Sequence, residues 1–303
     1  MNQKTLAAID MGTNATRMAI GVVDDQNGLE IVHTHRYPLR LGTDVFCNGN
    51  ITSVLIEDCM GIFANIKKTL ASRNIAAIRA VATSALREAK NSKTLIDRIK
   101  NETGIKIEVI SGIEEASLLS WAVCEKLELS EGSHMIADLG AGSLELIKVK
   151  GKKPVWMESF TISAVQYAGM DISILENIIP AKLEEALSSA RGYFENVDSF
   201  IASGGNIEVL GRLLESQVDQ SGVRTINSFN LDVFINQCKR MTIEEIRYYF
   251  GLPMERAEVI GSASQIYKWL AKRVKAEKII VPMIGLKEAI LMDLAKSILE
   301  LEM

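Results

Sequence analysis

One turn pattern occurs twice in this sequence, and it constrains the fold more than any other feature. Residues 6–20 read LAAIDMGTNATRMAI, and residues 135–149 read MIADLGAGSLELIKV. Each copy has an apolar run, an aspartate, a glycine two residues later, a small polar turn and a second apolar run. Apolar runs on both sides of a glycine-rich turn are typical of two paired strands. We therefore expect the chain to build the same strand–turn–strand unit twice.

The segments around each copy extend this repeat over the whole chain. A meander of three strands is expected at the start, with the hairpin signal DDQNG at 24–28, and a second meander restarts near residue 133. After each meander strands alternate with helices, which favours a mixed α/β sheet flanked by helices. The expected strands are 5–11, 16–23, 30–38, 76–83, 105–110, 133–139, 143–150, 153–160, 199–205 and 277–282. The expected helical segments are 52–72, 91–104, 112–126, 163–195, 206–215, 229–250, 254–274 and 285–301.

The repeat predicts two α/β domains rather than one. The chain has 303 residues, which suits two domains of ordinary size. The boundary is expected near residues 125–132, where the strand pattern restarts. We expect domain I to comprise 1–126 with the C-terminal helix 286–303, and domain II to comprise 127–285. The two glycine turns are then expected to face each other across an interdomain cleft.

Composition narrows the class of protein. The chain is 48% apolar with a formal net charge of −4, which is typical of a globular protein and disfavours non-specific binding to DNA or to an anionic membrane. No apolar run is long enough to span a bilayer, and the N-terminus has no signal-peptide pattern. Four scattered cysteines without ligand spacing indicate reduced thiols, so we expect a cytoplasmic protein. Only three histidines are present, and catalysis is not expected to depend on them.

The first glycine turn carries hydrogen-bond donors. A glycine-rich turn between strands can direct backbone N–H groups toward a bound anion, and glycine lets a bulky phosphate approach the backbone. Thr13, Asn14 and Arg17 add side-chain donors, and Arg17 can hold a phosphate through two hydrogen bonds. An ordinary β-hairpin is the alternative for one copy alone. Two copies with matched spacing favour a phosphate site.

The second glycine turn carries acids instead. Asp138 and Glu145 offer the hard oxygen ligands that Mg²⁺ prefers. The turn between them adds further donors, from Gly140, Ala141, Gly142 and Ser143. A metal ion and an arginine acting on one phosphoryl group are a common way to stabilise its transition state. The alternative for Glu145 is an outward-facing strand carboxylate.

A third motif, VISGIEEASLL at 109–119, begins a helix. Ser111 and Glu114 have the spacing of a capping box, in which serine caps the helix and glutamate returns to the cap. Glu115 has no such structural role. A carboxylate in the first turn of this helix can orient and deprotonate a water for in-line attack on phosphorus.

Two further segments follow strand ends, where ligands bind in α/β sheets. Residues 80–91 place Thr83, Ser84 and Arg87 there, and a surface charge is the alternative for Arg87. Residues 202–206, ASGGN, place Gly204 and Gly205 between a strand and a helix. These glycines could hold a phosphate or a nucleotide base, or form only a tight connection.

These motifs, in this order, resemble the exopolyphosphatase / guanosine pentaphosphate phosphohydrolase (Ppx/GppA) phosphatase family. The resemblance covers nearly the whole chain, because members of the family carry segments close to several in this sequence. These segments are AIDMGTNATR (8–17), VATSALREAKN (81–91), VISGIEEAS (109–117), DLGAGSLEL (138–146), SGG (203–205), ERAEVI (255–260) and GLKEAIL (285–291).

The resemblance implies a fold, a reaction and residue roles. It implies two duplicated actin-like (ribonuclease-H-like) domains of the sugar kinase/actin ATPase superfamily, in the short two-domain form. The implied reaction, linked to the stringent response, releases orthophosphate from polyphosphate or the 5′-γ-phosphate from guanosine pentaphosphate. Glu115 would be the general base, and Asp138 and Glu145 would bind Mg²⁺ or Mn²⁺. The first turn, with Asn14 and Arg17, would contact the substrate phosphates.

The sequence departs from the family pattern at several positions, and the usual glycine after the strand 153–160 is missing from SFTISAVQYAG. Ala141 replaces a glycine and Leu144 a threonine, while Ser117 and Lys287 replace arginines, which weakens the expected phosphate grip. If position 141 needs a positive φ, alanine there costs roughly 1 kcal/mol. The proposed base and metal ligands are retained, so we expect an active hydrolase.

Two other functions and one assembly stay open from the sequence. A non-catalytic sensor of polyphosphate or guanosine tetraphosphate would explain the departures, and a kinase of the same fold is the third function. The apolar final helix, ILMDLAKSILELEM, could support a homodimer or face the core of its own domain.

Overall fold

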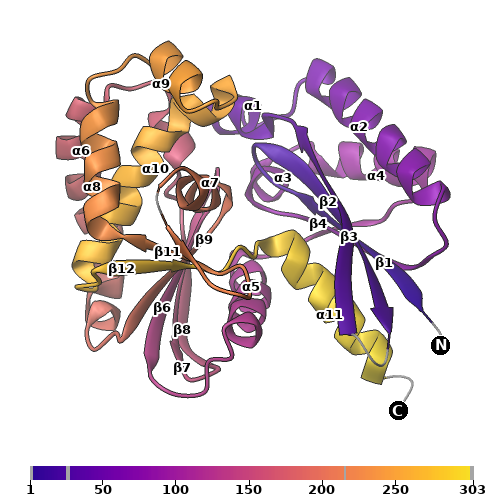
Figure 1. The fold of residues 1–303 in the computed structure, drawn as a ribbon. Coiled ribbons are helices and arrows are strands. Elements are labelled where there is room, and N and C mark those ends of the chain that lie inside the picture. Colours follow the sequence, from indigo (N-terminus) through magenta and orange to yellow (C-terminus); the bar gives the residue numbers. More distant parts are fainter. Residues whose placement is uncertain (1–2, 25–27, 215, 301–303) are drawn as a thin grey trace. The chain divides into compact units, whose positions relative to one another are not determined.

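The computed structural model describes residues 3–24, 28–214 and 216–300 and divides into two compact units (Figure 1). The first unit comprises Met1–Ala122 and Leu286–Met303. The second unit comprises Val123–Gly285. The chain therefore leaves the first unit, builds the second, and returns to the first with its last helix.

A five-stranded sheet in the order β3-β2-β1-β4-β5 forms the centre of the first unit. Its strands are β1 (Lys4–Met11), β2 (Ala15–Asp24), β3 (Gly28–Pro38), β4 (Ile75–Ala82) and β5 (Ile107–Val109). β1 and β3 run antiparallel to β2, whereas β4 runs parallel to β1 and to β5. Residues 25–27 of the predicted 24–28 hairpin turn lie outside the described residues.

Helices cover both faces of this sheet. They are α1 (Leu41–Asn48), α2 (Ser53–Ala71), α3 (Ser84–Glu88), α4 (Ser92–Thr103), α5 (Gly112–Lys126) and α11 (Leu286–Glu300). Apolar side chains of α1 to α4 pack on one face of the sheet, and those of α11 and the start of α5 on the other. Thr52 caps α2 as predicted, because its side chain accepts a hydrogen bond from the Leu55 N–H. The apolar residues of α11 are buried in this core, which favours the core-facing alternative for that helix.

The sheet of the second unit repeats that of the first. Its order is β10-β11-β12-β9-β6-β7-β8. Its strands are β6 (Ser133–Leu139), β7 (Leu144–Lys150), β8 (Lys153–Phe160), β9 (Ser199–Ser203), β10 (Gln217–Val218), β11 (Arg224–Asn227) and β12 (Lys278–Val281). Read from β8, the first five strands match β3-β2-β1-β4-β5 in order and in direction. The predicted duplicated α/β fold is therefore confirmed, with β10 and β11 as an unpredicted extension.

Helices pack against one face of the second sheet and share one apolar core with it. They are η1 (Ala164–Tyr167), α6 (Ile172–Ala186), η2 (Ser188–Phe194), α7 (Gly205–Leu213), α8 (Ser228–Cys238), α9 (Ile243–Tyr249) and α10 (Met254–Arg273). The predicted helix 229–250 is divided, because a capping box at Thr242 and Glu245 starts a new helix. In the parts of the chain that the structure describes, each helix is too short or too polar to cross a bilayer.

Candidate active site

The two glycine turns have the same backbone geometry. In the first turn the Gly12 N–H donates to the Ala15 carbonyl over 3.1 Å, and in the second the Gly140 N–H donates to the Ser143 carbonyl over 2.9 Å. A Cβ atom at either glycine would lie 3.3 Å from the carbonyl oxygen that its own N–H contacts. Both positions therefore favour glycine because of close backbone approach, and the sequence repeat is also a structural repeat.

In the first turn, strand register brings Asp10 opposite Arg17. Arg17 Nη1 donates to Asp10 Oδ2 over 3.0 Å. Asp10 is only 4% exposed, and this burial raises the pKa of its carboxyl group, which the charge and hydrogen bond of Arg17 partly offset. Arg17 thus pairs with a buried acid through Nη1. The sequence had predicted only a phosphate contact for this residue.

The end of β4 joins the first turn. The Thr83 N–H donates to the Met11 carbonyl over 3.3 Å. The hydroxyls of Thr13 and Ser84 lie 2.7 Å apart and are both buried. Asn14, at the tip of the turn, is half-buried. The structure therefore brings Thr13 of the first turn and Ser84 of the second segment together.

Glu115 and Arg87 are neighbours in the first unit. Glu115 lies in the first turn of α5 and is 8% exposed, and its Oε2 is 3.8 Å from Arg87 Nη1. Arg87 also donates to the Ile110 carbonyl over 2.9 Å. The surface-charge alternative for Arg87 is therefore wrong, because its guanidinium is held against the start of α5.

The predicted capping box at the start of α5 is only half formed. Ser111 Oγ accepts a hydrogen bond from the Glu114 N–H over 3.1 Å, as predicted. The Glu114 carboxylate pairs with Arg79 at 3.4 Å. Glu114 thus anchors the helix to β4, while the next residue, Glu115, is buried beside Arg87.

In the second turn, strand register brings Asp138 opposite Glu145. Asp138 is 8% and Glu145 1% exposed, and a carboxylate oxygen of one lies within 4.8 Å of one of the other. Ser159 Oγ donates to Glu145 Oε1 over 2.7 Å. The outward-facing alternative for Glu145 is therefore wrong. Two buried carboxylates this close repel each other unless a cation lies with them, and their hard oxygens fit Mg²⁺ or Mn²⁺.

The glycine pair after β9 packs directly against this acidic pair. Gly204 has a φ of +102°, and a Cβ atom there would lie 2.9 Å from Asp138 Oδ1. Glycine is required here both by conformation and by space. The buried Tyr267 hydroxyl donates to the Ser203 carbonyl over 2.7 Å and so fixes the strand end that leads into this turn.

Comparison with known proteins connects this geometry to a family. The model of the Ppx/GppA phosphatase family matches residues 20–298. The chain belongs to this family. Exopolyphosphatase 1 of Mycobacterium leprae is 24% identical over 305 residues, which cover 95% of this chain and 88% of that protein. A putative exopolyphosphatase of Haemophilus influenzae is 24% identical over 274 residues, covering 85% of this chain and 81% of the relative.

Solved structures of Ppx/GppA proteins share the fold. The structure of the Aquifex aeolicus Ppx/GppA family member superposes with a TM-score of 0.81 at 25% identity, covering 98% of this chain and 99% of that one. The structure of an exopolyphosphatase from Cytophaga hutchinsonii gives a TM-score of 0.87 at 22% identity, over 97% and 98% of the two chains. The second likeness shows the fold alone.

Two departures from the family pattern prove milder than the sequence suggests. Ala141 does not have a positive φ; the non-glycine residues that do, in the described part of the chain, are Glu128, Asn196, Lys275 and Met283. The conditional strain at Ala141 is therefore absent. Leu144 is fully buried, and its side chain packs in the apolar core of the second unit.

The other two departures concern charge. Ser117 is exposed on α5. Lys287 Nζ donates to the carboxylate of its neighbour Glu288. Lys287 is thus placed in the first unit with a carboxylate partner, and its predicted contact with phosphate stays a prediction.

Sequence reasoning missed Arg256 of this Ppx/GppA protein. Arg256 Nη1 donates to Asn206 Oδ1 over 2.7 Å. A Cβ atom at Gly205 would lie 2.6 Å from Arg256 Nη2, so the guanidinium lies directly on the glycine pair after β9. The ERAEVI segment at 255–260 was the available signal, because it places an arginine in a motif of the family.

Proposed function

We propose that this Ppx/GppA protein is a Mg²⁺-dependent phosphoanhydride hydrolase. It releases terminal orthophosphate from inorganic polyphosphate, the 5′-γ-phosphate from guanosine pentaphosphate, or both. One observation carries the proposal: the second glycine turn holds two buried carboxylates, Asp138 and Glu145, where the first turn holds an ion pair. A phosphatase that must neutralise a polyanionic substrate has a use for such a cation site.

Asp138 and Glu145 hold the divalent ion in this proposal. When bound, Mg²⁺ or Mn²⁺ would supply positive charge that stabilises the phosphoryl oxygens in the transition state. Ser159 fixes one oxygen of Glu145, and Gly204 leaves room beside Oδ1 of Asp138. These contacts orient the two carboxylates before any substrate binds.

Glu115 accepts the proton of the attacking water. A carboxylate base must be fixed in place and must be able to reach the water's proton. Burial and the neighbouring Arg87 restrict the rotamers of Glu115 and put a positive charge beside it. The bond that forms joins the water oxygen to the terminal phosphorus, and the bridging P–O bond breaks.

The remaining predicted residues bind the phosphates of the substrate. In the first unit they are Thr13, Asn14, Arg17, Ser84, Arg87 and Lys287. In the second unit they are the backbone of Gly140, Ala141, Gly142 and Ser143, and the glycine pair Gly204 and Gly205. Both sets consist of backbone N–H groups, hydroxyls and cations, which are the usual donors to phosphate oxygens.

The substrate class rests on the relatives and on charge. The two relatives from Mycobacterium leprae and Haemophilus influenzae carry the name exopolyphosphatase, which supports polyphosphate. The net charge of −4 does not favour a long basic channel, so short chains or nucleotides suit this chain better. A sensor that binds the same ligands without turnover is the alternative, and the loss of arginines at Ser117 and Lys287 favours it.

The test is orthophosphate release with Mg²⁺ from short-chain polyphosphate, long-chain polyphosphate and guanosine pentaphosphate in parallel. We expect release from at least one substrate and none from the Glu115→Gln protein, which should still bind it. Unchanged turnover in Glu115→Gln would remove Glu115 as the base. Tight binding without release would establish the sensor, and a phosphorylated acceptor would establish a kinase.

A further inference from the structure

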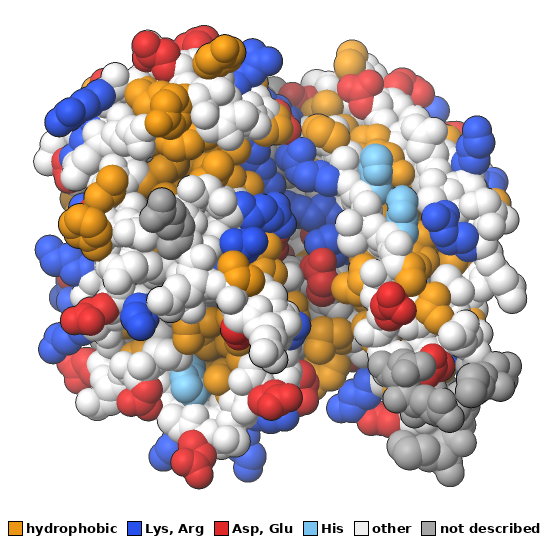
Figure 2. Space-filling model, in the orientation of Figure 1, with side chains coloured by type: hydrophobic (Ala, Val, Ile, Leu, Met, Phe, Trp, Pro, Cys, Tyr) orange, Lys and Arg blue, Asp and Glu red, His pale blue; other side chains and the backbone are white. Residues whose placement is uncertain are grey.

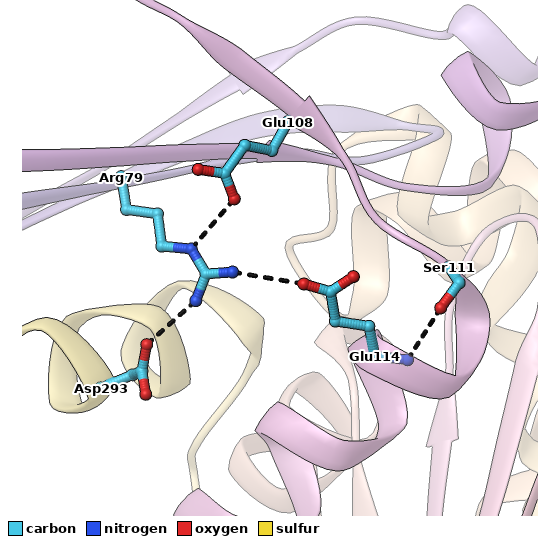
Figure 3. Close-up of polar contacts among 5 residues, drawn as sticks. All are labelled: Arg79, Glu108, Ser111, Glu114 and Asp293. Carbon is cyan, nitrogen blue, oxygen red and sulfur yellow. Dashed lines mark hydrogen bonds and ion pairs between the residues drawn. The ribbon is translucent and has the colours of Figure 1, made fainter.

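Arg79 lies at the centre of an ion-pair network in the first unit. It projects from β4, and each of its three guanidinium nitrogens contacts a different carboxylate (Figure 3). Nε is 3.3 Å from Glu108 Oε2, Nη2 is 3.4 Å from Glu114 Oε1, and Nη1 is 3.0 Å from Asp293 Oδ2. The Arg79 side chain is only 19% exposed. Its planar guanidinium group is therefore held in one orientation by carboxylates on β5, α5 and α11.

The elements that Arg79 joins carry residues of the proposed site. β4 leads directly into Ser84 and Arg87. Glu114 lies in the first turn of α5, next to Glu115, and Asp293 lies on α11, which begins beside Lys287. The Arg79 guanidinium thus links β4, the start of α5 and α11. Each of these three segments carries or leads into a residue of the proposed site.

We propose that Arg79 is a positioning residue for Glu115. It acts by holding the first turn of α5 against β4. This inference rests on the proposed function, in which Glu115 activates the water. Arg79 itself does not contact substrate in this proposal.

The local contacts show why the tether acts on Glu115 in particular. The Glu114 N–H is held by Ser111 Oγ, and the Glu114 carboxylate is held by Arg79. Backbone and side chain of Glu114 are thus both anchored, and the carboxylate of the next residue, Glu115, lies 3.8 Å from Arg87 Nη1. Successive side chains of a helix project about 100° apart, so one glutamate can grip β4 while the other points elsewhere.

Removing Arg79 should loosen this turn for an electrostatic reason. Three carboxylates surround one cation, and without it they repel one another. A lysine keeps one positive charge but cannot contact three carboxylates in a plane. We therefore expect Arg79→Met to displace the start of α5 most and Arg79→Lys to displace it less.

A matched control exists in the same unit. Arg98 on α4 contacts Glu57 and Glu102, so it also pairs with more than one carboxylate. None of these three residues lies on β4, α5 or α11. Arg98→Met therefore removes an arginine and its ion pairs without touching the tether.

The first measurement is amide hydrogen exchange of the segment 112–118, which needs no substrate. We expect exchange there to rise about tenfold in Arg79→Met, the change expected when a charge-assisted hydrogen bond is lost. Glu114→Gln should reproduce much of this rise, and Arg98→Met should not. Unchanged exchange at 112–118 in Arg79→Met would overturn the inference whether or not the protein proves to be a hydrolase.

The second measurement is steady-state kinetics on the substrate that the wild-type protein hydrolyses. Displacing a base by about 1 Å lowers kcat by about 10- to 100-fold, and we expect this for Arg79→Met with KM changed less than about threefold. Arg79→Lys should recover part of kcat. The double variant Arg79→Met/Glu114→Gln should be no slower than Arg79→Met, because both changes break one tether.

The outcomes separate this inference from the proposed function. If Glu115→Gln is inactive and Arg79→Met retains full kcat, the positioning role of Arg79 is wrong, but Glu115 is still supported as the base. If Glu115→Gln is as active as wild type, the assigned base is wrong, and the exchange measurement alone decides whether Arg79 tethers the helix. A loss of kcat equal to that in Arg98→Met would show only general destabilisation and would also overturn the inference.

Discussion

The two glycine turns are built alike, and they differ in the sign of one charge. In each turn an aspartate lies in register with the residue seven positions later, and the same backbone hydrogen bond closes the loop. In the first turn that partner is Arg17, and the pair neutralises itself. In the second it is Glu145, so two buried carboxylates lie with oxygens within 4.8 Å of each other. At equivalent strand positions, the first turn has Arg17 and forms an ion pair, whereas the second has Glu145 and forms the proposed metal site.

Histidine plays no comparable part in either turn. His33 and His35 stack with ring centroids 6.4 Å apart on the edge strand β3, away from the first turn along the chain. His134 is the second residue of β6, and its ring nitrogens contact Ser199 Oγ and the Glu131 carbonyl. Histidine side chains are pale blue in Figure 2, among them exposed ones. The charged groups that distinguish the two turns are therefore carboxylates and an arginine.

The largest effect is expected when a proposed metal ligand of the second turn is removed. Asp138→Asn removes a negative charge from the acidic pair without changing its shape, so the affinity for the divalent ion should fall. Changes to groups that only support metal ligands cost about 10- to 100-fold, and loss of a ligand should cost at least as much. The Mg²⁺ concentration needed for half-maximal activity is the measurement. An unaltered Mg²⁺ titration would count against a ligand role for Asp138.

The second prediction concerns the ion pair of the first turn and the stability of the folded protein. Arg17→Met removes the cation that forms the ion pair with the buried carboxylate of Asp10, so the free energy of unfolding at neutral pH should fall by about 3 kcal/mol. Urea unfolding measures this. The double variant Asp10→Asn/Arg17→Met should recover most of the loss, because no charge is then left buried. Equal losses in the single and double variants would contradict the account.

The same pair predicts a pH dependence. Burial raises the pKa of Asp10 above its ordinary value of 3.8, so the folded protein binds this proton more tightly than the unfolded chain. The stability that this proton contributes is fully present below that ordinary value and is lost as the pH rises through the folded-state pKa. Without Arg17 the raised pKa should rise further, so Arg17→Met should lose more stability than wild type as the pH rises above the ordinary pKa of 3.8.

The smallest effect is expected for a backbone change in the second turn, at Ala141. Because Ala141 does not adopt a positive φ, glycine there should relieve no strain and should add freedom to the unfolded chain. Ala141→Gly should therefore keep its activity and lose about 0.5–1 kcal/mol of stability. Thermal unfolding and phosphate release measure the two quantities. A gain in stability would show that alanine strains the turn after all.

The sequence predicted the fold well where patterns are local. The three-strand meanders, the Thr52 cap and the restart near residue 133 follow from alternation and turn residues within a few positions. Helix α1 was not predicted, because its sequence contains glycine and lacks a side-chain cap. It is held instead by tertiary contact, since the Gly42 N–H donates to the Thr13 carbonyl over 3.0 Å. Such a contact between separate segments leaves no local signal.

The residue types of the candidate site could be named from the sequence, but their partners could not. Motif spacing pointed to Glu115, Asp138 and Glu145, and the structure buries all three. The Asp10–Arg17 pair, and the contact of Arg256 with the glycine pair after β9, depend on strand register or on packing between distant elements. The burial of Leu144 in the core could not be read from a motif, because a motif does not say which face of a strand is covered.

The most direct test of the central claim is Mn²⁺ binding, measured by electron paramagnetic resonance, to wild type, Glu145→Gln and Arg17→Met. Mn²⁺ serves as a spectroscopic substitute for Mg²⁺ at oxygen ligands. We expect one tight site in wild type, its loss in Glu145→Gln and its retention in Arg17→Met. A tight site that persists in Glu145→Gln, or that disappears only in Arg17→Met, would contradict the assignment of the cation to the second turn.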